Sequence, residues 1–209
     1  MNRERPYAQA GLLTVVAGIA DSVGYITMGG IFAANMTGNT VLAGISLAEG
    51  HYVTAARRAA PLLAFFLGAL LARLLLRLRH KPAVPLLIEA ALIAAVGFLP
   101  ISTEPAILIV ALAMGLQASA LTQFGGVAVS TVVVTSTLAR VADATLDRAW
   151  PAAKPAQPPV AAPRLLMLTW AGYLVGAIAG AFLLRVTGQP LLVPAALLVI
   201  VVLLGEAKA

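Results

Sequence analysis

The chain has 209 residues, of which 61% are hydrophobic and 11% are charged. Soluble domains carry about 45–50% apolar and about 25% charged residues, so the composition excludes a water-soluble enzyme, a disordered chain and a nucleic-acid-binding domain. The chain has no cysteine, which excludes disulfides and thiol catalysis, and its net charge of +6 fits Lys and Arg retained in cytoplasmic loops. We therefore expect an all-α integral membrane protein that lies in the lipid bilayer as a single domain, residues 1–209.

Apolar stretches separated by charges, proline and glycine indicate the membrane segments. In chain order they are Ala8–Met28, Ile31–Ala48, Pro61–Leu78, Val84–Leu99, Ile107–Leu121, Val127–Ala139, Leu165–Leu184 and Leu191–Leu204. Six of them are predicted to be full transmembrane helices, and the second and the sixth are predicted to be broken, re-entrant segments. Eight full spans are the alternative.

The second and sixth stretches share an unusual pattern. Each follows or contains a Gly-Gly pair and then has three small polar residues: Thr37, Gly38 and Asn39 in the second, and Thr135, Ser136 and Thr137 in the sixth. Thr, Ser and Asn cap helix N-termini because their side-chain oxygens accept from free backbone N–H groups. We therefore predict an extended segment followed by a half-helix that starts inside the membrane. A helix from residue 37 to 48 would be about 18 Å long, too short to cross alone.

The chain resembles itself at a fixed spacing. Gly18 and Gly115 match at an offset of 97, Thr37 and Thr135 at an offset of 98, and the block 64–72 matches 172–180 at an offset of 108. The larger offset comes from a Pro-rich cytoplasmic loop predicted at 143–164. We predict two internal repeats, about 8–100 and about 105–205. With three spans each, they are inverted relative to one another.

Small residues recur every four positions in both matched blocks, at Ala64, Gly68 and Ala72 and at Gly172, Gly176 and Gly180. Such stripes allow close approach of helices. They fit packing within one chain, and a homodimer interface is the alternative.

The positions of the basic residues predict the topology. With six spans and a cytoplasmic N-terminus, eleven Lys and Arg lie inside and three outside, whereas eight spans give nine and five. The outer three would be Arg57, Arg58 and Arg185. The charge count favours six spans with the N-terminus in the cytoplasm.

Three segments resemble the YoaK family of small bacterial inner-membrane proteins of unknown function, proposed to be transporters. They are Ala17–Tyr25, Gly30–Thr40 and Met114–Ala118. The resemblance covers nearly the whole chain and implies a transporter-like protein of the inner membrane, without naming a substrate. The family pattern has a second Thr-Gly and a Gln-Asn pair where this chain has Thr135-Ser136 and Gln117-Ala118.

Asp21 is the only charged residue between Pro6 and Ala48. A carboxylate at the centre of a spanning helix costs about 2.5–3.5 kcal/mol, so such a residue faces a cavity or a partner. Asp21 is either a residue that exchanges a proton or cation, or a structural acceptor for a helix terminus such as the 37–39 amides. For Glu89, an interfacial position and a role in the pathway both stay open.

The sequence predicts a membrane transporter for a small solute or ion, with its site where the two half-helix N-termini meet. Helix N-termini favour anions or dipoles. The candidate site residues are Asp21, Asn35, Thr37, Gly38, Asn39, Gln117, Thr135, Ser136 and Thr137. A passive channel for a small solute or anion is the alternative, and a lipid-binding or scaffold role is a third. An intramembrane enzyme is disfavoured because only one Asp and no His lie at membrane depth. No cofactor and no metal are expected.

Overall fold

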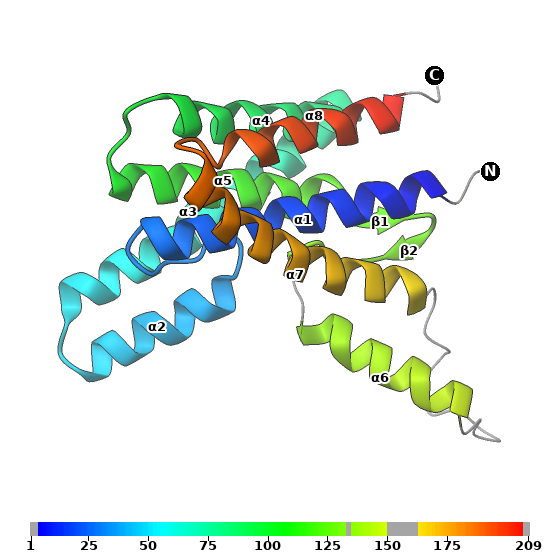
Figure 1. Cartoon of the computed structure of the whole chain (residues 1–209), viewed down its shortest axis with the longest axis horizontal. Helices are drawn as coiled ribbons and strands as arrows, with labels where there is room; N and C mark the ends of the chain where they lie inside the picture. The colour runs from blue at the N-terminus through cyan, green and yellow to red at the C-terminus, as the bar shows by residue number, and fades with distance from the viewer. Residues whose placement is uncertain (1–3, 133–134, 150–162, 207–209) are drawn as a thin grey trace.

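A computed structural model describes residues 4–132, 135–149 and 163–206 of the chain. These residues form a helical bundle with one short hairpin (Figure 1). The helices are α1 (Glu4–Thr27), α2 (Met36–Ala48), α3 (Tyr52–Arg79), α4 (Ala83–Phe98), α5 (Thr103–Ala120), α6 (Thr135–Ala149), α7 (Pro163–Val186) and α8 (Leu192–Glu206). The hairpin pairs β1 (Gln123–Phe124) with β2 (Val127–Ala128) in antiparallel register.

Four of the described helices, α1, α3, α5 and α7, are long and apolar enough to cross a membrane, and α4 and α8 are shorter apolar helices. Large apolar side chains lie exposed along the outer faces, for example Phe66 and Leu70 on α3 and Ile178 and Phe182 on α7. In water these faces would be unstable, whereas lipid tails solvate them. The predicted class, a helical membrane protein, is confirmed.

The two Gly-Gly pairs make tight turns. Gly29 and Gly30 at the end of α1 have φ angles of 79° and 70°, and Gly125 and Gly126 between the two strands have 59° and 84°. Residues with a Cβ rarely adopt this left-handed conformation, so glycine is needed at each of the four positions. The turns reverse the chain before the second and sixth apolar stretches become helical.

Two helix pairs form the tightest part of the bundle, α1 with α7 and α3 with α5. At Gly18 of α1 an added Cβ would collide with the carbonyl oxygen of Tyr173, and at Gly115 of α5 with that of Phe65. Likewise Gly176 lies against the Val15 carbonyl and Gly68 against the Leu112 carbonyl. Both small-residue stripes therefore pack helices within one chain, and a homodimer would need another surface.

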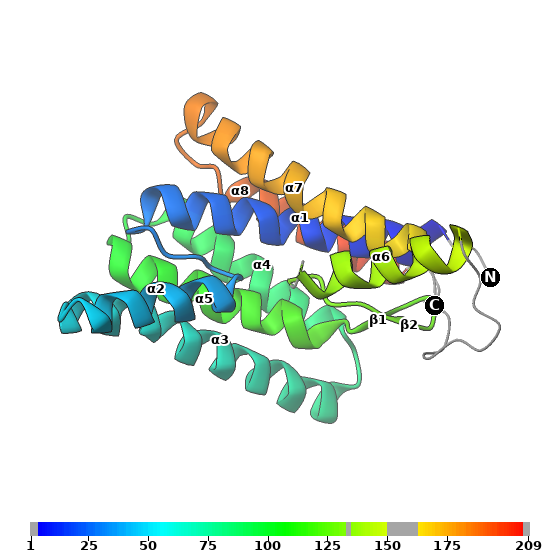
Figure 2. The ribbon, with the colours of Figure 1, turned by 90° about the horizontal axis from the view of Figure 1, so that it is seen from below.

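The helix ends gather in two groups. A cavity of about 600 Å³ lined by Gln9, Lys81, Leu121 and Gly205 brings together the start of α1, the α3–α4 turn and the ends of α5 and α8. At the opposite end, Arg57 and Glu104 form an ion pair of 3.0 Å between the starts of α3 and α5. From the middle, α2 and α6 run toward opposite ends of the bundle (Figures 1 and 2).

Two predicted boundaries are corrected by the structure. The predicted cap Thr37 already lies inside α2, because the helix begins at Met36 and Asn35 is its N-cap. The predicted loop 143–164 begins too early, because α6 continues to Ala149 and α7 begins at Pro163. Residues 143–149 include two alanines and no proline or glycine, which favours helix. The remainder of that loop, 150–162, lies outside the described residues.

Candidate functional site

Asp21 lies in the C-terminal part of α1 with only 2% of its surface exposed. Its Oδ1 accepts hydrogen bonds from the backbone N–H groups of Ala34 at 2.6 Å and Asn35 at 3.2 Å. Its Oδ2 accepts a hydrogen bond from the hydroxyl of Tyr173 on α7. Charge-assisted bonds of this kind are about twice as strong as neutral ones. The carboxylate thus joins α1, the segment before α2, and α7.

The backbone that enters α2 is fixed by two asparagines. Asn35 Oδ1 accepts from the Gly38 N–H at 3.0 Å and caps the helix. Asn39, completely buried, holds Phe32 from both sides: its Oδ1 accepts from Phe32 N–H at 2.9 Å and its Nδ2 donates to Phe32 O at 2.7 Å. A Cβ at Gly38 would lie 2.9 Å from the Phe32 ring. Both asparagines and Gly38 thereby hold the start of α2 in place.

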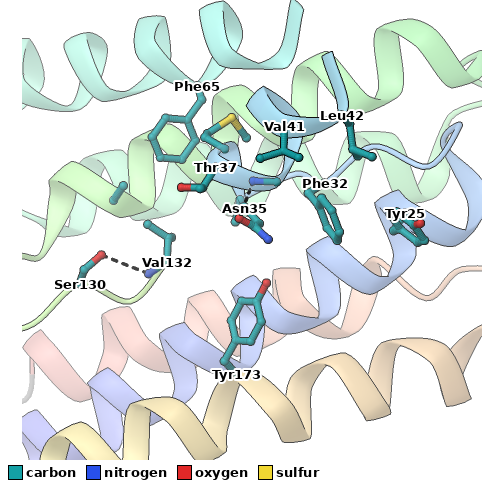
Figure 3. Close-up of a pocket in the computed structure, with 14 residues that line it drawn as sticks. Tyr25, Phe32, Asn35, Thr37, Val41, Leu42, Phe65, Ser130, Val132 and Tyr173 are labelled. Carbon is teal, nitrogen blue, oxygen red and sulfur yellow. Dashed lines mark hydrogen bonds between the residues drawn. The ribbon is translucent and has the colours of Figure 1, made fainter. Parts of the chain in front are cut away.

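A cavity of about 800 Å³ lies beside this helix start. Figure 3 shows Tyr173 pointing toward Asn35, with Phe32 next to Asn35. Phe65 and Val132 line the cavity as well. The Tyr25 and Phe32 rings stack with centroids 4.8 Å apart. The residues that line the cavity come from both tight helix pairs, α1–α7 and α3–α5, and from the segments before α2 and α6. Exposed Thr37 lines it as well.

In the second half of the chain, Gln117 is completely buried. Its Nε2 donates to the Leu13 carbonyl at 3.0 Å and to Thr131 Oγ1 at 3.1 Å. Gln117 thus anchors the segment before α6 to α1 and does not line the large cavity. Its neighbour Ala118 does.

The remaining three predicted residues are the first residues of α6. Thr137 is buried and lies beside Thr14, Thr131 and Thr169 in a group of threonines. This group adjoins the large cavity through Ser130 and Tyr173, but Thr137 does not line that cavity. The side chains of Thr135 and Ser136 lie outside the part of the chain that the structure describes.

The charge distribution changes the expected ligand. Among the described residues, no Lys or Arg lines the cavity. The carboxylate of Asp21 already occupies the amides next to the α2 N-terminus, which is where an anionic ligand was expected. The geometry therefore suits a neutral or cationic ligand better than an anion.

Several features of this region escaped sequence reasoning. The role of the Tyr173 hydroxyl was one of them. The repeats offered one sign of it, because the position that matches Tyr173 in the first repeat is Phe65, whose ring has no hydroxyl. Glu89 was left open between the membrane interface and the pathway. The structure buries it completely in α4, so its carboxylate does not extend to the surface. Proline and apolar neighbours gave no sign of this depth.

These features define a helical, multi-pass membrane protein with a buried carboxylate–tyrosine pair beside an internal cavity. The family described as "Protein of unknown function (DUF1275)" matches residues 9–204, and the chain belongs to this family. It is 32% identical over 139 residues to the UPF0700 transmembrane protein YoaK of Bacillus subtilis (strain 168). That match covers 61% of this chain and 62% of the relative, less than two thirds of the relative's length. No solved structure matches the chain. The predicted resemblance to YoaK is confirmed.

Proposed function

We propose that this protein is a carrier for a small neutral or cationic solute, with the central cavity as its binding site. The observation that carries the proposal is the buried Asp21 carboxylate, whose Oδ2 is bonded to a tyrosine that itself lines the cavity. Intramembrane carboxylates are costly and mark substrate or ion pathways. The chain acts as a transporter rather than an enzyme in this proposal, and it needs no cofactor.

Tyr173 links the cavity to the carboxylate. Its ring lines the cavity, and its hydroxyl donates to Asp21 Oδ2. A solute with an N–H, O–H or cationic group can replace that donor when the tyrosine side chain rotates. Asp21 Oδ1 stays bonded to the Ala34 and Asn35 amides, so occupancy of the cavity is transmitted to the start of α2.

The movement that we propose is a rocking of one tight helix pair against the other. The close glycine contacts within α1–α7 and within α3–α5 support treating each pair as one moving body, and the cavity has residues from both. The matched collisions at Gly18 and Gly115, and at Gly176 and Gly68, support two repeats that are built alike. Inverted repeats with a site at their interface are a common transporter plan.

We further propose six crossing helices with α2 and α6 re-entrant, in the bacterial inner membrane with the N-terminus in the cytoplasm. The grouping of the α1 start with the α3–α4 turn and the ends of α5 and α8 supports this topology. In this cysteine-free chain, Ala56→Cys should react with an impermeant maleimide from outside, and Pro82→Cys should not. Both positions are exposed. The reverse labelling pattern would overturn the topology and favour eight spans.

The transport proposal is tested in two stages with the purified full chain. A thermal-shift screen with small amines, quaternary ammonium ions, polyols, amino acids and organic acids identifies ligands, because a ligand of the native state raises the Tm. Uptake of each hit is then measured in proteoliposomes for wild type and Asp21→Asn. Asp143→Asn, an exposed residue of α6, is the matched control.

A carrier predicts that Asp21→Asn abolishes accumulation against a gradient while Asp143→Asn accumulates like wild type. Unchanged gradient dependence in Asp21→Asn would contradict coupling through Asp21 and favour the channel. Hits confined to organic anions would contradict the ligand class.

A further inference from the structure

Glu89 presents a second buried acid, outside the central cavity. It lies in α4 with no exposed surface. Among the described residues neither of its carboxylate oxygens has a hydrogen-bond partner, in contrast to Asp21, which has three donors. An ionised carboxylate without any donor is among the most unfavourable groups that an apolar interior can hold. Glu89 therefore needs a cation or a proton as its companion.

Glu89 can be placed relative to a second cavity, which lies at the end of the bundle where α3 turns into α4. That cavity, about 600 Å³, is lined by Gln9, Leu86, Leu121 and Val202 from α1, α4, α5 and α8. Residues three or four apart lie on the same face of a helix, one turn apart. One turn deeper on the same four faces are Leu13, Glu89, Gln117 and Leu198, and all four are completely buried.

Gln117 contributes a second unsatisfied oxygen to this layer. Its Nε2 has two acceptors, but its Oε1 is buried without a partner in the described chain. A carboxylate and an amide carbonyl are the hard oxygen ligands that small cations and protons prefer. A single carboxylate balances one positive charge, and no group of three or more His, Cys, Asp or Glu that could hold a metal ion occurs among the described residues.

We propose that Glu89 and Gln117 Oε1 form a binding site for one monovalent cation, a proton or an alkali ion, that is reached from the cavity lined by Lys81 and Leu86. Cation binding at Glu89 does not depend on the proposed transport function. The further idea that this cation is the coupling ion does rest on that proposed function.

The neighbouring elements carry charges at both ends of the bundle. At the end of the cavity lie Glu4 and Arg5 at the start of α1, the exposed Arg73, Arg77 and Arg79 near the end of α3, and His80 and Lys81. Toward the other end lie Asp21 of α1, Arg57 and Arg58 at the start of α3, and Glu104 at the start of α5. The described side chains of α8 include no charged group. His80 and Lys81 are exposed and are solvated at the mouth of the cavity.

The first test reads occupancy in the wild-type protein. In nanodiscs, an apolar carbodiimide reacts with protonated carboxyl groups, and mass spectrometry measures the modified fraction of Glu89. The reaction is run at constant ionic strength in choline, sodium or potassium chloride, and over a pH series with free acetate as the internal reference. If an alkali ion binds, sodium or potassium protects Glu89. If a proton binds, modification falls as the pH rises and the salts have no effect.

The second test is thermal and uses variants. Whichever condition protects Glu89 should change the Tm of wild type by at least about 3 °C, because a ligand of the native state shifts unfolding. Glu89→Gln should lose this response, whereas the matched control Glu104→Gln, an exposed acid, should keep it. If Glu89→Gln does not fold, the labelling result alone decides.

Modification of Glu89 that responds to neither pH nor alkali ions would overturn the proposal, as would an unchanged thermal response in Glu89→Gln. These outcomes are independent of flux. A responsive Glu89 in a protein that transports nothing would therefore contradict the proposed carrier and leave the cation site intact.

Discussion

The two sides of the central cavity are built on similar scaffolds with different chemistry. On the first side, Asp21 holds the segment before α2 by two amides, and Asn39 grips Phe32 by two further bonds. On the second side, the segment before α6 is held by the neutral side chain of Gln117, through Thr131, and by Arg140 of α6, whose guanidinium donates to the Ala128 carbonyl at 3.1 Å. The backbone collisions that glycine avoids recur on both sides. Close helix packing is thus common to the two halves, whereas the buried acids of the described residues, Asp21 and Glu89, both lie in the first.

Positions matched between the halves show the same asymmetry. At an offset of 97 Asp21 corresponds to Ala118, and when Val84-Pro85 is aligned with Val193-Pro194 Glu89 corresponds to Leu198. Both buried acids therefore lie in the first half. A helix terminus fixed by a charge can respond when that charge is neutralised, whereas one fixed by an amide cannot. We infer that the first half contains the responsive elements and the second completes the cavity wall.

The largest effects should come from the shared scaffold. Gly18→Val and Gly115→Val each place a side chain against a backbone carbonyl that cannot rotate away. Overpacking costs about 1–3 kcal/mol even where side chains can move, so we expect at least about 3 kcal/mol here. The two variants should lose similar amounts of folded protein by size-exclusion profile and Tm. A tolerated Gly115→Val beside a disrupted Gly18→Val would break the structural similarity of the two halves.

Asn39→Ala should show that the start of α2 is held more strongly than the start of α6. It removes both bonds to Phe32 and leaves the partly buried N–H and C=O of Phe32 without this partner, at up to about 1–3 kcal/mol for each unsatisfied group. The matched position in the second half is Thr137. Thr137→Ala should cost clearly less, because Asn39 makes a two-point contact with the backbone. Equal losses in a denaturation series would show that both starts are held with the same strength.

Tyr173→Phe tests the carboxylate pair. It removes a hydrogen bond to a charged group, worth about 1.5–3 kcal/mol, and leaves the ring in the cavity wall. We expect a large loss of uptake with a smaller loss of Tm. Tyr52→Phe, which alters an exposed tyrosine, is the matched control. Proportional losses of uptake and Tm would reduce the tyrosine to a structural role.

The smallest effects concern the polar side chains at the cavity edge. Asn35→Ala removes a helix cap and should cost about 0.5–2 kcal/mol. Ser130→Ala removes only a 3.4 Å bond to the Val132 N–H on the exposed second side, and should fall within about 0.5 kcal/mol of wild type. Thermal unfolding of both variants under one condition measures the difference. A larger loss for Ser130→Ala would contradict the weaker anchoring of the second side.

Much of the molecule could be predicted from its residues. Composition alone indicates a membrane protein, because an apolar fraction of 61% leaves too few polar side chains to cover a soluble surface. The Gly-Gly pairs indicate where the chain turns, since only glycine adopts those φ angles without strain. The scarcity of charge in an apolar stretch singles out Asp21. Each of these signals can be read from the residue types alone, without knowing which segments meet in the fold.

What the tertiary structure decided was which groups meet. Tyr173 lies 152 residues from Asp21, and no local pattern relates a hydroxyl on α7 to a carboxylate on α1. The structure also moved the helix cap from Thr37 to Asn35 and assigned Asn39 to the backbone of Phe32. Glu89 became a buried acid because four helices converge around it. Hydrogen bonds and desolvation depend on distances across the bundle, and those distances are fixed only when the helices pack.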